Sequence, residues 1–217
     1  MRVVYVKSPF QFDIRETDIP EPGENQVLLD VRACAVCGTD MHTAESDADI
    51  FQSFGHEIAG VVVENGPGSY RFRAGDKVVV ESGTFCHVCE NCRNGRPDLC
   101  TNGLSILDDV EISGYADYML APEQALVAFD GLDFKEAALA EPLGVALDLF
   151  YTTGIELNDD VAVVGLGPIG LMTIALAKAA GARNIYAIQR SKRSKARIEL
   201  ARKLGATDVI LTEDTDL

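Results

Sequence analysis

The sequence predicts a β-rich unit over residues 1–144, followed by the first half of a doubly wound α/β unit over residues 145–217. Three observations support this fold class. A length of 217 residues corresponds to about one and a half domains at roughly 150 residues each. The first 140 positions contain short apolar runs separated by turn residues. From Asp160 onward, apolar strands alternate with helical segments, as in one half of a doubly wound sheet.

Strands in the first unit are predicted from apolar runs that end or begin at turn dipeptides. Val27–Val31 is one such run, and Ile58–Val63 is a second, which precedes the turn pair Asn65-Gly66. Lys77–Val80 follows the pair Gly75-Asp76. This pattern of short apolar runs and turns indicates antiparallel β structure.

The pattern changes near Glu141, which precedes a proline and is predicted to cap a helix over Pro142–Thr153. The apolar run Asp160–Gly165 then suits a buried parallel strand, and an Ala/Leu-rich helix follows it and ends at Gly181. The remaining predicted elements are a strand at Asn184–Ile188, a helix that ends near Gly205, and a strand at Asp208–Leu211.

Composition excludes several classes of protein. The chain is 47% hydrophobic and 24% charged, which is ordinary for a globular protein, and its net charge of −15 argues against nucleic-acid binding. The N-terminus lacks the apolar core of a signal peptide, so we expect a cytoplasmic protein. The uncharged stretch Val161–Ala177 carries three glycines and a proline, and no membrane span is expected there.

Four of the six cysteines, Cys86, Cys89, Cys92 and Cys100, have the spacing C-x2-C-x2-C-x7-C. In a reducing compartment such a cluster indicates a metal site, and four thiolates close a tetrahedral shell around structural Zn²⁺. A ferredoxin-like iron–sulfur run would place three residues before the last cysteine and a proline after it. Four unrelated thiols or a zinc-ribbon nucleic-acid module are further alternatives. The predicted zinc lobe spans about residues 82–103.

A second candidate metal site combines Cys37 with His56 and Glu57. A thiolate, an imidazole and a carboxylate give zinc three ligands and leave a fourth position open for water or substrate. The alternative is that these residues are structural and unrelated. Two of the three histidines in the chain, His42 and His56, nevertheless fall within these two short segments.

The motif GxGxxG directly follows a predicted strand and opens a helix. Such a loop allows a tight turn and the close approach of a dinucleotide pyrophosphate to a helix N-terminus. The predicted cofactor-binding residues of this loop are Gly165, Gly167, Pro168, Ile169 and Gly170.

About twenty residues later, where an NAD-binding protein should show an acidic residue, the sequence has Gln189 followed by Arg190. The segment from Arg183 to Lys203 holds eight basic residues and one acidic residue. An arginine makes a charge-assisted bond with a 2′-phosphate worth roughly 1.5–3 kcal/mol. We therefore expect Gln189, Arg190 and Arg193 to contact NADP, with NAD as the alternative. The alternative for the basic residues is a solvated helix face.

Taken together in order, five motifs resemble the zinc-dependent medium-chain alcohol dehydrogenases, most closely the polyol (sorbitol) and threonine dehydrogenase branch. They are CGTDMH, GHE, the four-cysteine lobe, AEPLGVAL and VGLGPIG. The similarity runs from about Val3 to Leu211. It implies a GroES-like catalytic β-barrel domain, followed by a partial Rossmann domain that would continue after residue 217.

The resemblance implies roles for individual residues. Cys37, His56 and Glu57 match the catalytic zinc ligands. Glu141 matches a further ligand position, at which the polyol branch has a glutamate that binds zinc directly or through water. Thr39 matches the hydroxyl that accepts the substrate proton, and His42 a relay toward solvent. Asp40 matches a residue that orients a ligand imidazole.

The implied function is reversible oxidation of a secondary alcohol, of polyol, sugar or hydroxy-acid type, by a nicotinamide cofactor, with two zinc ions per chain. The partners expected are a small-molecule alcohol and, in a full-length protein, further copies in a homodimer or homotetramer, without nucleic acid or membrane. The alternative is a non-catalytic zinc-binding fragment or interaction module that lacks the nicotinamide half of the site.

Overall fold

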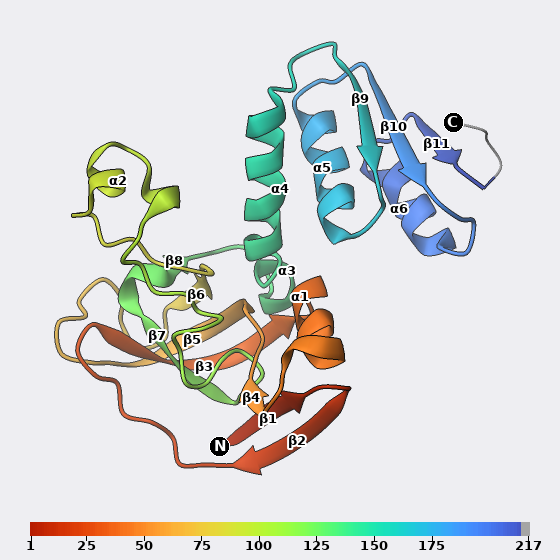
Figure 1. The fold of residues 1–217 in the computed structure, drawn as a ribbon. Helices are drawn as coiled ribbons and strands as arrows, with labels where there is room; N and C mark the ends of the chain where they lie inside the picture. The colour runs from red at the N-terminus through yellow and green to blue at the C-terminus, as the bar shows by residue number, and fades with distance from the viewer. Residues whose placement is uncertain (214–217) are drawn as a thin grey trace. The chain divides into compact units, whose positions relative to one another are not determined.

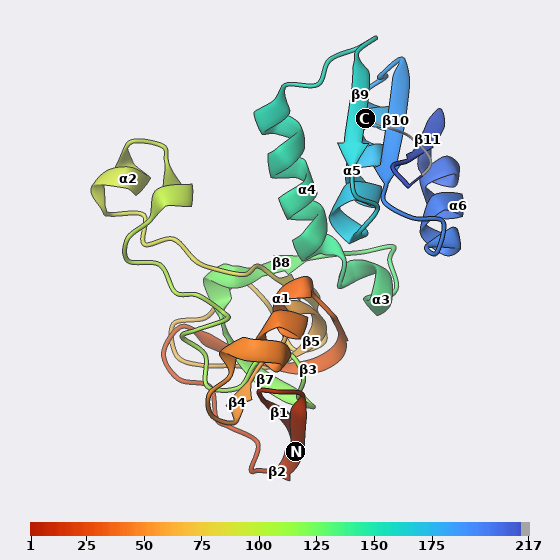
Figure 2. The same ribbon diagram turned by 45° about the vertical axis from the view of Figure 1, so that its right-hand side comes forward.

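A computed structural model describes residues 1–213 of the chain (Figures 1 and 2). The chain divides into two units, Met1–Glu141 and a second unit that begins at Pro142. Each unit has a hydrophobic core of its own.

The first unit is built on a five-stranded antiparallel sheet with the order β7-β3-β5-β6-β8. Its members are β3 (Gln26–Ala35), β5 (Glu57–Asn65), β6 (Lys77–Val80), β7 (Tyr118–Pro122) and β8 (Leu126–Ala128). Alternate residues of these strands point inward, so their β-branched and aliphatic side chains form the core. Leu29, Ile58 and Met119 are almost fully buried in it.

A smaller antiparallel sheet has the order β2-β1-β4, with β1 (Arg2–Lys7), β2 (Gln11–Glu16) and β4 (Gln52–Ser53). Short helical turns occupy the connections of this unit. They are α1 (Gly38–His42), η1 (Thr43–Asp47), α2 (Glu90–Arg93), η2 (Pro97–Leu99), η3 (Glu123–Ala125) and α3 (Phe134–Ala137).

The helix predicted at Pro142–Thr153 begins two residues earlier, as α4 (Ala140–Thr153). Glu141 therefore lies within its first turn and does not cap it, which corrects the predicted start. The cap in this region belongs to α3, where Asp133 accepts a hydrogen bond of 2.8 Å from the backbone N–H of Glu136.

The second unit contains β9 (Asp160–Val164), α5 (Pro168–Ala179), β10 (Asn184–Gln189), α6 (Lys195–Leu204) and β11 (Asp208–Leu211). The strands are parallel in the order β11-β10-β9, and α5 and α6 pack on the sheet (Figure 2). This confirms the predicted first half of a doubly wound fold. The buried side chains of Ile174, Ile185 and Ile198 belong to the hydrophobic core that the helices and strands of this unit share.

Strand β9 is an edge of this sheet, because among residues 1–213 it pairs only with β10. Its Val161 and Val163 side chains are buried, whereas Val164 is 79% exposed. Across the described part of the chain, every helix is too short or too polar to span a lipid bilayer.

Candidate metal centres and nucleotide loop

Strand pairing brings together the three residues of the predicted open metal site. Strands β3 and β5 are antiparallel, and Ala35 at the end of β3 lies opposite Glu57 at the start of β5. Cys37 follows β3 and caps α1, while His56 immediately precedes β5. Two segments nineteen residues apart in sequence therefore meet where β3 ends and β5 begins.

The ligand atoms of Cys37, His56 and Glu57 all lie within 4.8 Å of one another. His56 and Glu57 are buried, at 3% and 5% exposure, and Cys37 is half-buried. Such a cluster offers one sulfur, one nitrogen and one oxygen donor, which leaves a four-coordinate zinc ion one open position.

Asp40 faces the histidine of this cluster. Its Oδ1 lies 3.6 Å from Nδ1 of His56, beyond hydrogen-bonding length, and its Oδ2 accepts a bond of 2.9 Å from the backbone N–H of Cys37. Nδ1 of His56 is buried without a hydrogen bond. Because Nδ1 faces the Asp40 carboxylate, Nε2 is the nitrogen left for a cation.

The electrostatics of the cluster favour a positive charge. The facing Asp40 carboxylate raises the pKa of His56 to about 9, against the opposing effect of burial. Burial raises the pKa of Glu57, and repulsion from Glu141 adds to that increase. A buried carboxylate beside a cysteine is costly unless it is neutralised or paired. A divalent cation would offset this cost, so the donor set fits zinc.

Three other predicted residues surround the cluster. Oγ1 of exposed Thr39 lies 3.6 Å from Sγ of Cys37. His42 is also exposed; its Nδ1 is 3.2 Å from Oγ of Ser46 and its Nε2 is 3.5 Å from Oδ2 of Asp47. Glu141 acts on Glu57 through its charge but lies outside the group of ligand atoms within 4.8 Å. Its role as a fourth ligand stays a prediction.

The four-cysteine lobe forms a compact group of sulfur atoms. The Sγ atoms of Cys86, Cys89, Cys92 and Cys100 lie within 4.8 Å of one another, with separations of 4.0 Å for the 86–92 and 89–100 pairs. Four thiolates at 2.3 Å from a tetrahedral zinc ion are about 3.8 Å apart. The lobe therefore needs little contraction to hold zinc.

Backbone donors stabilise thiolates in this lobe. The N–H groups of Cys92 and Thr101 lower the pKa of Cys89 to about 6, and the N–H of Cys86, 3.3 Å from Sγ of Cys100, lowers the pKa of Cys100. Burial, and then the adjacent cysteines, raise the pKa of Cys92 to about 12. Several thiolates this close repel one another, and a doubly charged cation would remove that repulsion.

The glycine-rich loop has the geometry that its motif predicts. Gly165 adopts φ +94° and its N–H donates to Ile188 at 2.9 Å, which ties the loop to β10. Gly167 caps α5, with Pro168 at the first helical position. A side chain on Gly170 would overlap the carbonyl oxygen of Gly165. A hollow of about 650 Å³ adjoins the loop and is lined by Gly165, Gly167, Ile169 and Gly170 among others.

Gln189, at the end of β10, is already engaged by neighbouring residues. Its Oε1 accepts a bond of 3.2 Å from the N–H of Leu166, and its Nε2 lies 3.4 Å from Oγ of Ser194. The amide therefore links the glycine-rich loop to the start of α6, where an acidic residue would have placed a negative charge.

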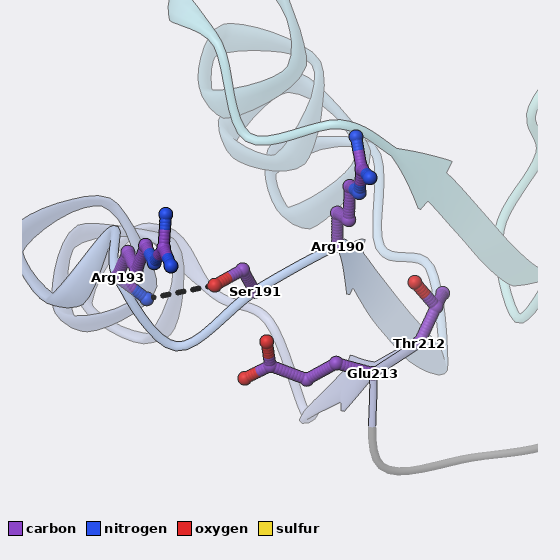
Figure 3. Close-up of a pocket in the computed structure, with 5 residues that line it drawn as sticks. All are labelled: Arg190, Ser191, Arg193, Thr212 and Glu213. Carbon is purple, nitrogen blue, oxygen red and sulfur yellow. Dashed lines mark hydrogen bonds between the residues drawn. The ribbon is translucent and has the colours of Figure 1, made fainter.

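Beside it, a hollow of about 580 Å³ is lined by Arg190, Ser191, Arg193, Thr212 and Glu213 (Figure 3). The N–H of Arg193 donates to Oγ of Ser191 at 3.2 Å. Within residues 1–213, neither Arg190 nor Arg193 forms an ion pair. Two guanidinium groups and two hydroxyls are suitable donors for a phosphate, while Glu213 adds one opposing charge.

Some residues around these sites carried no signal in the sequence. Tyr115 contacts Asp40, which lies 75 residues earlier in the sequence. Glu213 accepts a hydrogen bond from the N–H of Lys192, which lies 21 residues earlier. No spacing rule connects such pairs, because only the tertiary fold brings them together.

Known protein families match residues in both units of the chain. Residues 23–131 match the alcohol dehydrogenase GroES-like domain, and residues 168–217 match the zinc-binding dehydrogenase family. An L-threonine 3-dehydrogenase from Pyrococcus horikoshii is 37% identical over 99% of this chain. The chain spans 62% of the length of that relative.

Solved structures give the same picture. Galactitol-1-phosphate dehydrogenase from Escherichia coli superposes with a TM-score of 0.90 at 26% identity, covering 100% of this chain and 62% of that one. A zinc-binding dehydrogenase from Sinorhizobium meliloti 1021 bound to NADP gives 0.88 at 31% identity, covering 99% and 63%. The predicted GroES-like and partial Rossmann architecture is therefore confirmed.

Proposed function

Because this chain belongs to the zinc-dependent medium-chain alcohol dehydrogenase family, we propose that it supplies the metal-binding unit and half of the cofactor unit of an alcohol dehydrogenase. The reaction is reversible oxidation of a secondary alcohol to a ketone. The carbon-bound hydrogen leaves as hydride to the nicotinamide, and the hydroxyl proton leaves to solvent.

The cluster of Cys37, His56 and Glu57 carries this proposal. These side chains would hold zinc, which when bound supplies a Lewis acid that lowers the pKa of a substrate hydroxyl. Asp40 keeps the imidazole of His56 oriented from behind. Glu141, in the first turn of α4, is our candidate for a fourth, exchangeable ligand.

Thr39 and His42 provide a route for the proton. The Thr39 hydroxyl, beside Sγ of Cys37, accepts the substrate proton and gives up its own. His42 is exposed and faces Asp47, so it can pass a proton to water.

We propose NADP as the preferred cofactor, with its pyrophosphate at Gly165–Gly170 and its 2′-phosphate in the hollow at Arg190 and Arg193. Gln189 supports this preference because it is neutral, whereas a carboxylate there would repel the phosphate. One arginine contact changes relative affinity by about one to two orders of magnitude.

The substrate we propose is a small polyol, sugar alcohol or hydroxy acid, and the working form of a longer protein is a homodimer or homotetramer. The structure describes all six cysteines and none of them is in a disulfide, which suits the cytoplasm as the location. The competing proposal is a zinc-binding fragment without catalytic activity.

Zinc content tests the metal site. We expect two zinc ions per chain in the purified parent protein and one in Cys37→Ala. Cys34→Ser is the matched control, because Cys34 is a thiol near the cluster that is not among its ligands, and it should retain two. One zinc in both the parent and Cys37→Ala would favour the fragment.

Binding of 2′,5′-ADP and 5′-AMP tests the cofactor preference on the adenosine side alone. Arg190→Ala should weaken the binding of 2′,5′-ADP by about 10- to 100-fold and leave the binding of 5′-AMP nearly unchanged. Gln189→Asp should weaken 2′,5′-ADP as well. Equal affinity of the parent for the two ligands would contradict the preference for NADP.

A further inference from the structure

The segment Ser113–Tyr115 lies directly against the turn that carries His56. The N–H of Gly114 donates to the carbonyl of Gly55 at 2.9 Å, and the N–H of Tyr115 donates to that of Phe54 at 3.2 Å. The N–H of Ser113 also reaches Oγ of Ser53 at 2.8 Å. Three hydrogen bonds therefore hold this segment in fixed register with the residues that precede the histidine.

The Tyr115 ring packs against Phe54 and Gly55. Its centroid lies 4.5 Å from that of Phe54. A β-carbon built on Gly55 would lie 2.7 Å from Cδ2 of Tyr115, so the ring sits directly against that glycine. An aromatic ring packed in this way has few accessible rotamers, so the position of its hydroxyl group is well defined.

The Tyr115 hydroxyl contacts the carboxylate of Asp40. The Tyr115 hydroxyl lies 2.9 Å from Oδ2 of Asp40 and 2.8 Å from the carbonyl oxygen of Ala35. Oδ2 also accepts from the N–H of Cys37, while Oδ1 faces Nδ1 of His56 at 3.6 Å. Two donors on one oxygen thus fix the rotation of the carboxylate and direct the other oxygen at the imidazole.

We propose that Tyr115 is a positioning residue of the open metal site, which acts through Asp40 to set the orientation of His56; this rests on the proposed zinc function. Tyr115 itself touches neither metal nor substrate. With one hydroxyl proton and two acceptors, it donates preferentially to the charged carboxylate. Losing that donor leaves Oδ2 with the Cys37 N–H alone, and Asp40 gains freedom to rotate away from the histidine.

Cobalt binding provides the test, because Co²⁺ at a cysteine-containing site gives ligand-field and thiolate charge-transfer absorption that depends on geometry. The open-site signal is the part of the spectrum that Cys37→Ala removes from the metal-exchanged 217-residue protein. Tyr115→Phe retains the ring and its packing. We expect it to weaken Co²⁺ at the open site about tenfold and to shift that signal. The four-cysteine lobe should stay unchanged and reports that the unit is folded.

Two controls separate positioning from general stability. Tyr118→Phe removes a hydroxyl from β7 in the same unit and should leave the open-site signal intact. In an Asp40→Asn background, Tyr115→Phe should cause almost no further loss, since its effect passes through the carboxylate.

Two results would overturn the inference alone: an unchanged open-site spectrum and affinity in Tyr115→Phe, or the full tenfold loss repeated in the Asp40→Asn background. A parent protein without any Cys37-dependent signal would overturn the proposed function, and this inference with it.

Discussion

The ring of Tyr115 lies against the α-carbon of Gly55, the residue that immediately precedes His56. A β-carbon at Gly55 would approach Cδ2 of that ring to 2.7 Å and Sγ of Cys34 to 2.9 Å. Gly55 also has φ +95°, a conformation that L-residues with side chains rarely adopt. The position of the candidate zinc ligand thus depends on a glycine with both steric and conformational requirements.

Gly55→Ala should therefore destabilise the first unit by about 2–4 kcal/mol, the sum of backbone strain and overlap with fixed neighbours. Gly75 offers a matched control, because it has φ +97° but nothing within 4 Å of a built β-carbon. Gly75→Ala should cost about 1–2 kcal/mol, from strain alone. Denaturant unfolding of both variants measures the difference, and equal losses would show that the Tyr115 contact is readily relaxed.

The second and third glycines of the nucleotide loop, Gly167 and Gly170, should behave differently. A side chain on Gly170 would overlap the carbonyl oxygen of Gly165, whereas one on Gly167 meets nothing within 4 Å. We expect Gly170→Ala to lower the stability of the second unit by about 1–3 kcal/mol, and Gly167→Ala to leave it nearly unchanged.

Gly167→Ala should instead weaken binding of ADP-ribose, whose diphosphate requires close approach of the backbone. Thermal unfolding and calorimetric titration distinguish the two effects. Undiminished binding of ADP-ribose to Gly167→Ala would place the diphosphate elsewhere.

Elements bounded by strong turn signals were predictable from sequence. Strand Lys77–Val80 follows a Gly-Asp turn, and Asp208–Leu211 follows the glycine that ends α6; both match the structure to the residue. The hairpin of β1 and β2 was not predicted individually. Five of the six β2 residues are exposed, so this edge strand has no buried face to impose an apolar alternation.

The candidate sites were predictable to the extent that residue chemistry identifies them. Cysteine spacing predicted the cluster at Cys86–Cys100, which the structure brings together. Residue types alone left a structural interpretation of Cys37, His56 and Glu57 open, and the resemblance to the dehydrogenase family favoured a metal site there. The groups that orient these residues could not be predicted from the sequence in the same way. Tyr115 meets Asp40 only because the segment before β7 folds against the turn before β5, a contact that no local pattern encodes.

The cysteine lobe should depend on its metal for structure. Neither α2 nor η2 contains a buried residue, so the lobe has no apolar core to replace zinc. Cys92→Ser should lower zinc from two ions to one and expose Arg93 to trypsin, while the core around Leu29 and Ile58 stays folded. Mass spectrometry of limited digests would detect the cut. Resistance at Arg93 in a zinc-deficient variant would contradict this dependence.

The exposed edge at β9 should govern self-association of the 217-residue chain. Val164 is 79% exposed on a strand with one described neighbour, and such an edge can pair with a second chain. Val164→Lys should reduce association in sedimentation velocity without lowering the thermal midpoint. Val163→Lys, one residue earlier but only 7% exposed, should instead unfold the second unit, because it buries a charge in the core. Unchanged association in Val164→Lys would mean that chains do not pair through β9.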